Sequence, residues 1–284
     1  MGKVSANATE ARVTVIQTGS TLVSPAVPNR ASRRMSFAYT GLFQRRSSRI
    51  EVPVKAFLVE VGGHRVLVDT GWSEQCVEHA LSHMGFSLWF ASEPVVAPGE
   101  GMGPQLKRLG LTPQQLDAVI LTHMDCDHAS GLVDLDGAPR VLTSAEEIEA
   151  AGRRDVRYRP AFWKGVSLEA VSFAPMEGTP FGRGCDLFGD GTVELVFTPG
   201  HTAGSLAVIV RNPASGRFAL LAGDTGYNAA SWDELRLPGP LVDAEKMRHS
   251  LAWVRDQRGR DNCAGVLAAH DPNPALKGGA VLSF

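Results

Sequence analysis

The chain has 284 residues, of which 44% are hydrophobic and 20% charged, so it is long enough for a sizeable core and has the composition of a globular protein. A formal net charge of −2, with no Lys/Arg run longer than Arg45-Arg46, speaks against a nucleic-acid partner. The apolar runs are too short to span a membrane, which speaks against a membrane protein.

The cysteines and the first residues bear on the cellular compartment. The four cysteines are scattered and include no CxxC pair, so neither a zinc ribbon nor a disulfide scaffold is indicated. The segment Met1–Ala6 lacks the apolar stretch of a secretory signal. We therefore expect a cytoplasmic protein whose thiols are reduced.

The first predicted elements are strands. Arg12–Thr18 is a predicted strand, and the Ser-, Arg- and Pro-rich stretch 19–50 is predicted to be loop. Phe57–Val61 and Val66–Val68 predict a hairpin through the Gly62-Gly63 turn.

Two helical segments and a buried strand follow. Residues 74–90 are predicted to be helical, and the Gly- and Pro-rich stretch 91–104 is predicted to be loop. Thr112–Gln115 has a Thr cap, a Pro at the first helical position and a Gln three residues after the cap, which predicts a short helix. Ala118–Leu121 then predicts a buried strand.

The second half of the chain also alternates between predicted helices and strands. A capping box at Ser144–Glu147 starts a helix that Gly152 is expected to stop, and a last helix is predicted at Ala244–Arg258 with Asp243 as its cap. Strands and helices in both halves, without an internal repeat, predict one α/β domain over 1–284. The strands of this half are predicted at Val193–Phe197, Leu206–Val210, Phe218–Leu221 and Val266–Ala268.

Five of the predicted strands are each followed by a His or an Asp. Sites in α/β sheets gather outside strand ends, so these side chains are expected to converge on one site. The five residues are Asp69, His123, His201, Asp224 and His270.

The densest polar cluster is His123-Met-Asp125-Cys-Asp127-His128. If the chain stays extended, which the preceding β-branched run favours, His123, Asp125 and Asp127 share one side and a turn brings in His128. If it is helical, His123 and Asp127 stack while Asp125 points elsewhere. Four N and O donors within six residues suit a divalent cation, and leaving them buried without partners would cost several kcal/mol. An EF-hand is excluded because Ser130 stands where that loop needs Gly.

These motifs resemble the metallo-β-lactamase superfamily, whose signature is His-x-His-x-Asp-His followed downstream by His, Asp and His. The match covers nearly the whole chain in order and spacing. It implies an α/β fold, the four-layer αβ/βα sandwich, with metals at one edge. The matching motifs are Val-Asp69-Thr-Gly, His123–His128, Thr-Pro-Gly-His201-Thr-Ala-Gly-Ser, Ala-Gly-Asp224-Thr-Gly and His270.

Within the superfamily the chain is similar to the N-acyl homoserine lactonase branch. The similarity is carried by Gln105–Pro113, Asp186–Gly191 and Tyr227, three residues after Asp224. It implies a hydrolase that opens a lactone or cleaves a related ester, with an acylated lactone as small-molecule substrate. A monomer and a homodimer are both compatible with it.

The resemblance also assigns roles. It implies two divalent ions and a hydroxide held by them as the nucleophile. Tyr227 would donate to the developing oxyanion, Asp127 would carry the proton to the leaving alkoxide, and Asp69 would orient the ligand loops. The implied ligands are His123, Asp125 and His201 for one ion, Asp127, His128 and His270 for the other, and Asp224 as the bridge.

Asp125 departs from the signature, which has a second histidine there. Zinc is the expected ion, but the additional negative charge of Asp125 favours harder ions such as manganese or iron. Flavodiiron proteins are similar in having a Glu at this place, although a flavin domain does not fit in 284 residues. Two alternatives remain: another hydrolase of this frame (a thioesterase, β-lactamase or phosphodiesterase), or a non-hydrolytic di-iron redox or metal-binding protein.

Two insertions separate the motifs, near 72–104 and 150–185, and are expected to wall the substrate pocket. Their aromatic residues are Trp89, Phe90, Phe162 and Trp163, for which core packing is the alternative. Cys126 is expected to be a packed thiol beside the site. The remaining histidines are interpreted as hairpin-turn (His64) or helix-surface (His79, His83, His249) residues.

Overall fold

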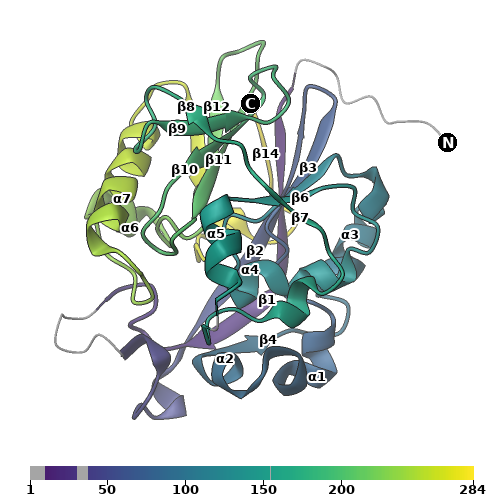
Figure 1. The fold of residues 1–284 in the computed structure, drawn as a ribbon, viewed down its shortest axis with the longest axis vertical. Helices are drawn as coiled ribbons and strands as arrows, with labels where there is room; N and C mark the ends of the chain where they lie inside the picture. Colours follow the sequence, from purple (N-terminus) through teal and green to yellow (C-terminus); the bar gives the residue numbers. More distant parts are fainter. Residues whose placement is uncertain (1–9, 31–37, 154) are drawn as a thin grey trace.

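A computed structural model describes residues 10–30, 38–153 and 155–284, and in it two mixed β-sheets pack face to face with helices on both outer faces (Figure 1). This arrangement confirms the expected αβ/βα sandwich. The segment Met1–Ala6, on which one expectation was based, lies outside the described residues, as does part of the predicted 19–50 loop. Among the helices of the described ranges, none is long and apolar enough to cross a bilayer.

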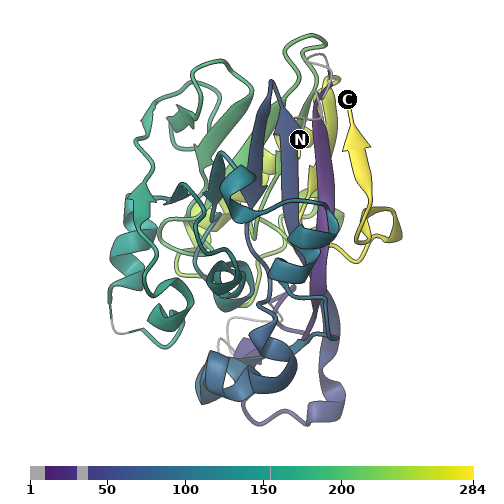
Figure 2. The same cartoon turned by 90° about the vertical axis from the view of Figure 1, so that its right-hand side faces the viewer.

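The first sheet contains eight strands within the described ranges, in the order β14-β1-β2-β3-β5-β6-β7, with β4 paired to β1 beside this path. Figure 2 shows the C-terminal strand β14 lying alongside β1 at one edge. The strands are β1 Arg12–Val23, β2 Ile50–Val61, β3 His64–Val68, β4 Ser92–Val95, β5 Ala118–Ile120, β6 Val141–Thr143, β7 Leu168–Ala170 and β14 Val281–Ser283.

The second sheet contains six strands within the same ranges, in the order β13-β12-β11-β10-β9-β8. The strands are β8 Ala174–Pro175, β9 Arg183–Asp186, β10 Val193–Phe197, β11 Leu206–Arg211, β12 Phe218–Leu221 and β13 Cys263–Leu267. The α-helices are α1 Gln75–Met84, α2 Phe86–Ala91, α3 Met102–Arg108, α4 Cys126–Ala129, α5 Ala145–Ala151, α6 Ala229–Asp233 and α7 Ala244–Arg258. Short 3-10 turns lie at Ala38–Thr40, Arg46–Ser48, Pro113–Gln115, Ser130–Asp134, Pro160–Trp163 and Pro274–Leu276.

The core forms three layers of buried side chains. The central layer fills the space between the sheets and includes Val59 and Val208, which are fully buried. A second layer lies between the first sheet and helices α1, α3 and α4, with Trp72 at its centre. The third lies under α6 and α7, where Met247 and Leu251 of α7 face the second sheet, as the helical spacing predicts.

Parallel pairing brings the strand ends together. Strand β3 pairs in parallel with β5, and β12 pairs in parallel with β13, so the residues that follow each pair leave the sheets at a common edge. Asp69 and His123 come from the first pair, and Asp224 and His270 come from the second. The predicted convergence of these four residues therefore follows from two parallel pairings, one in each sheet, whereas His201 follows β10, which pairs antiparallel with β11.

Two predicted loops contain regular structure. Strand β1 continues to Val23, five residues beyond its predicted end at Thr18. The 91–104 stretch is not all loop, because it holds β4 and the start of α3. Glu74 organises it, since its carboxylate accepts the backbone N–H groups of Gly99 and Gly101. These long-range contacts, rather than local propensity, overcome the Gly and Pro content.

The 123–128 segment is extended only as far as Asp125, so the prediction of an extended chain through Asp127 is wrong. Asp125 keeps extended backbone angles, and its carbonyl accepts the N–H groups of His128 and Ala129, which begins α4. The helical turn therefore directs Asp127 and His128 away from Asp125. This change of direction divides the motif between two groups of ligands.

Candidate metal centre

The structure brings the predicted metal ligands together at the common edge of the two sheets. We call His123, Asp125 and His201 site A, and Asp127, His128 and His270 site B. Within each site the potential ligand atoms lie within 4.8 Å of one another. Asp224 lies between the sites, with Oδ1 3.3 Å from Nε2 of His128 and Oδ2 3.4 Å from Nε2 of His201.

Site B has the dimensions of a divalent-ion site. Nε2 of His270 lies 3.3 Å from Oδ2 of Asp127 and 3.4 Å from Oδ1 of Asp224. Ligand atoms about 2.0–2.1 Å from a tetrahedral ion lie about 3.3–3.4 Å apart, so these separations are those of a shared cation. Within the described part of the chain, Nε2 of His128 and Oδ1 of Asp224 are buried without a hydrogen-bond partner. Unpaired buried polar atoms are costly, and a cation between them would satisfy both.

The site B imidazoles are oriented through their other nitrogen. Nδ1 of His128 donates to Oδ2 of Asp69 at 2.9 Å, and Nδ1 of His270 donates to the Pro53 carbonyl at 2.8 Å. Each bond leaves Nε2 directed at the carboxylates, as in metal sites whose histidines are fixed from behind. Asp69 also accepts the N–H and hydroxyl of Thr122, so it orients the loops as the resemblance implies. It does so from a strained left-handed backbone, φ 57°.

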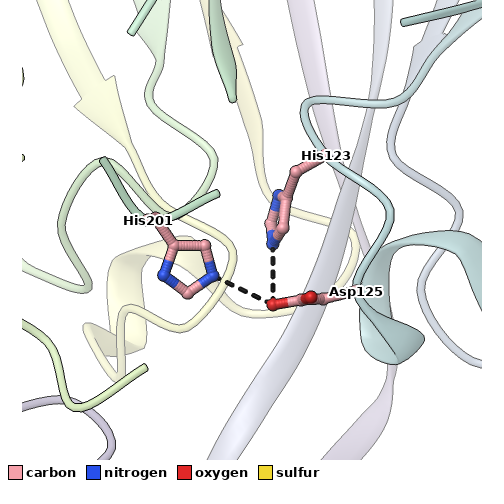
Figure 3. A group of neighbouring side chains, drawn as sticks. All are labelled: His123, Asp125 and His201. Atoms are coloured by element: carbon pink, nitrogen blue, oxygen red, sulfur yellow. Dashed lines mark hydrogen bonds and ion pairs between the residues drawn. The ribbon is translucent and has the colours of Figure 1, made fainter. Parts of the chain in front are cut away.

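Site A contains a residue that the sequence did not single out, Arg157. Its Nε donates to Oδ1 of Asp125 at 2.5 Å and its Nη2 to Oδ2 at 2.6 Å, which is a bidentate pair. The same Nη2 donates to Nε2 of His201 at 2.8 Å. His123 and His201 point at one oxygen of Asp125, at 3.4 and 3.0 Å (Figure 3). Site A as it stands is therefore engaged by a guanidinium group.

Arg157 sets the charge state of its neighbours. Burial works to raise the pKa of Asp125, but the Arg157 charge and the contacts with His123 and His201 outweigh it and hold the pKa well below its usual range. Burial lowers the pKa of His201, and Arg157 lowers it further. Asp125 is therefore ionised and His201 neutral beside the arginine.

Sequence reasoning missed Arg157 because it lies in an irregular segment, 32 residues from Asp125. The sequence pointed to such a residue only indirectly, because an additional buried carboxylate at Asp125 needs a cationic partner. His83 was also interpreted wrongly, because it is buried rather than on the helix surface, and its Nε2 contacts Oγ of Ser130 at 2.9 Å. Cys126 is a buried thiol, as expected, and burial raises its pKa well above the ordinary value.

Glu147 is a second missed residue and connects the two ligand loops. Its side chain is fully buried, with Oε1 accepting the N–H of Met124 and the hydroxyl of Tyr158, and Oε2 accepting the N–H of Gly204. Gly204 approaches so closely that a Cβ there would lie 2.2 Å from the Glu147 nitrogen. One carboxylate thus fixes the His123 loop, the His201 loop and the segment of Arg157.

We expect Glu147→Gln to lower the free energy of unfolding by about 1–3 kcal/mol, because an amide can accept on one oxygen only and leaves buried donors unpaired. Chemical denaturation of the metal-free protein measures this. The matched control is Glu149→Gln on the same helix, an exposed side chain, with an expected change within about 0.5 kcal/mol. Equal effects of the two variants would contradict the role of Glu147.

A cavity of about 530 Å³ opens over site B. Tyr227 lies on it, buried to 3% exposure and stacked on the His270 ring at 5.1 Å. Burial, with the negative charge of Asp224, raises the pKa of Tyr227 well above the ordinary value, so the phenol keeps its proton. The polar residues of the lining also include Asp125, Asp127, Arg157, Asp224 and His270.

The rest of the cavity wall is mainly apolar, and both predicted insertions contribute to it. From the first insertion come Phe86, Leu88 and Phe90, and from the second Val156. The expectation for the aromatics holds for Phe90 but not for Phe162, which is fully buried in the core. Trp89 and Trp163 pack against that core. Phe86, 69% exposed, was not predicted as a wall residue.

Two facing sheets that carry histidine and aspartate donors at one edge are the arrangement that the metallo-β-lactamase resemblance implies. The family model described as the metallo-beta-lactamase superfamily matches residues 49–262. The chain belongs to that superfamily.

Individual proteins are similar to this chain over most of its length. An N-acyl homoserine lactonase, AttM of Azorhizobium caulinodans, is 28% identical over 239 residues, covering 80% of this chain and 86% of that protein. A probable metallo-hydrolase of Mycobacterium tuberculosis is 32% identical over 222 residues, covering 75% and 68%. An N-acyl homoserine lactone hydrolase, solved with N-hexanoyl-L-homoserine at its catalytic metal center, superposes with a TM-score of 0.73 at 21% identity, covering 92% and 93%. The last of these shows the shared fold.

Proposed function

We propose that the protein hydrolyses lactones that carry an apolar acyl group, of the N-acyl homoserine lactone kind. The observation that carries this proposal is the cavity over site B, whose lining combines Asp127 and Tyr227 with many apolar side chains. A polar reaction centre at the end of an apolar cavity suits a substrate with one reactive carbonyl and one hydrocarbon tail. The similarity to named lactonases supports the same substrate class.

Site B fits a divalent ion, held by Asp127, His128, His270 and Asp224. Such an ion lowers the pKa of water and polarises a carbonyl group. We expect zinc, since imidazole nitrogens and carboxylate oxygens are ligands that zinc accepts. Asp125 is the reason for considering manganese or iron, and its pairing with Arg157 offsets the additional negative charge.

The chain's own residues have distinct tasks in this reaction. Tyr227 keeps its proton and donates a hydrogen bond to the carbonyl oxygen, which becomes negative when water adds to the carbonyl carbon, before the ring opens. Asp127, which lines the cavity, takes up a proton from the attacking water and delivers it to the leaving alkoxide. Asp224 faces Nε2 of His128 and of His270, and it is ionised, because its contacts with the histidines hold its pKa well below the usual range although burial alone would raise it.

Several finer expectations belong to this proposal. We propose that 1–284 is one domain, that the compartment is the cytoplasm and that the enzyme acts in quorum quenching, with a homodimer left open. The resemblance implies two ions, which the two donor groups would accommodate only if Arg157 left site A.

Acid release from a panel of substrates tests the proposed function. The panel contains N-decanoyl and N-hexanoyl homoserine lactone, the unacylated lactone, a thioester, a β-lactam and a phosphodiester. We expect kcat/KM to rise about tenfold or more from the unacylated lactone to the decanoyl lactone, because each buried methylene contributes about 0.8 kcal/mol.

Phe86→Ala is the matched variant, since Phe86 is exposed on the cavity wall and its loss should not unfold the protein. It should reduce kcat/KM for the decanoyl lactone and leave the unacylated lactone unchanged. Turnover of the thioester or phosphodiester without any lactone opening would contradict the proposal. So would a visible di-iron absorption that responds to O₂.

A further inference from the structure

The guanidinium group of Arg157 contacts two of the three donor residues of site A. Nη2 lies 2.8 Å from Nε2 of His201 and 2.6 Å from Oδ2 of Asp125. These two acceptor atoms are only 3.0 Å apart, so they need a cation or a proton between them. Arg157 supplies that cation, and its Nε also binds the second oxygen of Asp125.

An ion and Arg157 compete for the same lone pair. An unprotonated imidazole nitrogen has one in-plane lone pair, which can accept one N–H or bind one metal ion. Because a guanidinium only donates, Nε2 of His201 is the acceptor in this contact. An ion can therefore bind His201 through Nε2 only after Arg157 has left.

His201 is held differently from the other three ligand histidines, since His123 of site A also has a partner at Nδ1, Oγ1 of Thr122 at 3.0 Å. In site B, both imidazoles are fixed at Nδ1 by Asp69 and Pro53, and Nε2 faces the carboxylates. In site A, Nδ1 of the buried His201 has no hydrogen-bond partner among the described residues. His201 is thus positioned by Arg157 and Asp125 at Nε2, whereas the site B histidines carry the outer support typical of metal ligands.

The charges agree with this difference. Arg157 and Asp125 together are neutral, as is the histidine that the family signature has in place of Asp125. The paired side chains are only 17% and 15% exposed, so the contact is largely shielded from water. The aspartate and the arginine therefore form one unit that adds no net charge and occupies the Asp125 and His201 donors of site A, whereas Nε2 of His123 has no hydrogen-bond partner among the described residues.

We propose that Arg157 takes the place of the site A ion, so that the protein binds one divalent ion, in site B, instead of two. The inference rests on the proposed metal binding but not on the proposed substrate. A pair that only neutralised charge would need Arg157 to contact Asp125 alone. Here Arg157 also contacts Nε2 of His201, an atom that an ion would otherwise bind.

Metal counting tests the proposal. The metal-free protein is titrated with Zn²⁺ in a calorimeter, and the bound zinc is then measured by mass spectrometry after buffer exchange. We expect one ion per chain in the wild type and two in Arg157→Ala, with the additional binding step visible in the titration. Arg153→Ala is the matched control, because Arg153 is an exposed arginine in the same insertion paired with Glu149, and it should bind one ion.

Asp125→His/Arg157→Ala serves as a second variant in case the single variant, with Asp125 unpaired, fails to fold. It restores the signature histidine and should also bind two ions. Two ions in the wild type, or one ion in both variants, would overturn the inference and leave the proposed function standing. No ion in any of these proteins would overturn the inference together with the proposed metal dependence, whatever the lactone panel shows.

Discussion

Asp224→Ala is expected to give a folded protein that neither retains a divalent ion nor opens a lactone. Asp224 is the residue that both histidines of site B face, with Oδ1 3.3 Å from Nε2 of His128 and 3.4 Å from Nε2 of His270. Changes in the residues behind metal ligands cost about 10–100-fold in metal affinity or activity, so loss of this carboxylate should cost more than about 100-fold in both. A competition titration against a chromophoric chelator, together with kcat/KM, measures the effect.

Asp69→Asn provides the graded comparison. Asp69 touches His128 only at Nδ1, and asparagine tolerates its left-handed backbone conformation. The loss of zinc affinity should therefore lie within about 10–100-fold, below that of Asp224→Ala. If the two variants lost affinity equally, Asp224 would not be a ligand.

The second large effect concerns stability without metal. Asp125→Ala leaves the largely buried guanidinium of Arg157 without its carboxylate. We therefore expect the free energy of unfolding of the metal-free protein, prepared with a chelator, to fall by roughly 2–4 kcal/mol. Asp125→Ala/Arg157→Ala removes both charges and should recover at least half of that loss. Urea unfolding of the four proteins of this cycle gives the coupling energy directly.

The exposed pair Arg153–Glu149 is the matched control for this cycle, being 72% and 70% exposed with the same chemistry. Its coupling energy should be about 0.2–1 kcal/mol, as for other exposed ion pairs. A coupling of that small size for Asp125 and Arg157 would mean that their contact is no stronger than a surface ion pair.

The sequence predicted the sandwich and the position of the site because both depend on local patterns. Asp69, His123, Asp224 and His270 each follow a short apolar strand, and strand ends in parallel pairs meet at one edge. Periodicity also located α7 and its Asp243 cap at the observed residues. These features need no knowledge of contacts between distant segments.

The remaining features depend on contacts that periodicity does not encode. Arg157 lies in an irregular segment, and only the tertiary fold brings it to Asp125. His83 is buried because Ser130 and Phe162 cover it, although its helix is mostly exposed. The helical turn after Asp125 depends on the N–H groups of His128 and Ala129, which both donate to the Asp125 carbonyl, and an alternation argument cannot anticipate this.

Arg157 also changes how the centre depends on its surroundings. A guanidinium joined to the backbone is not extracted by a chelator, exchanged for another metal or lost when metal is scarce. With site A closed by Arg157, enzyme activity should follow the free concentration of metal as a single saturation curve, since one equilibrium decides whether the centre is complete. Of the two cationic groups in this centre, the guanidinium, with its single positive charge, is then part of the polypeptide, and only the divalent ion comes from the cell's metal supply.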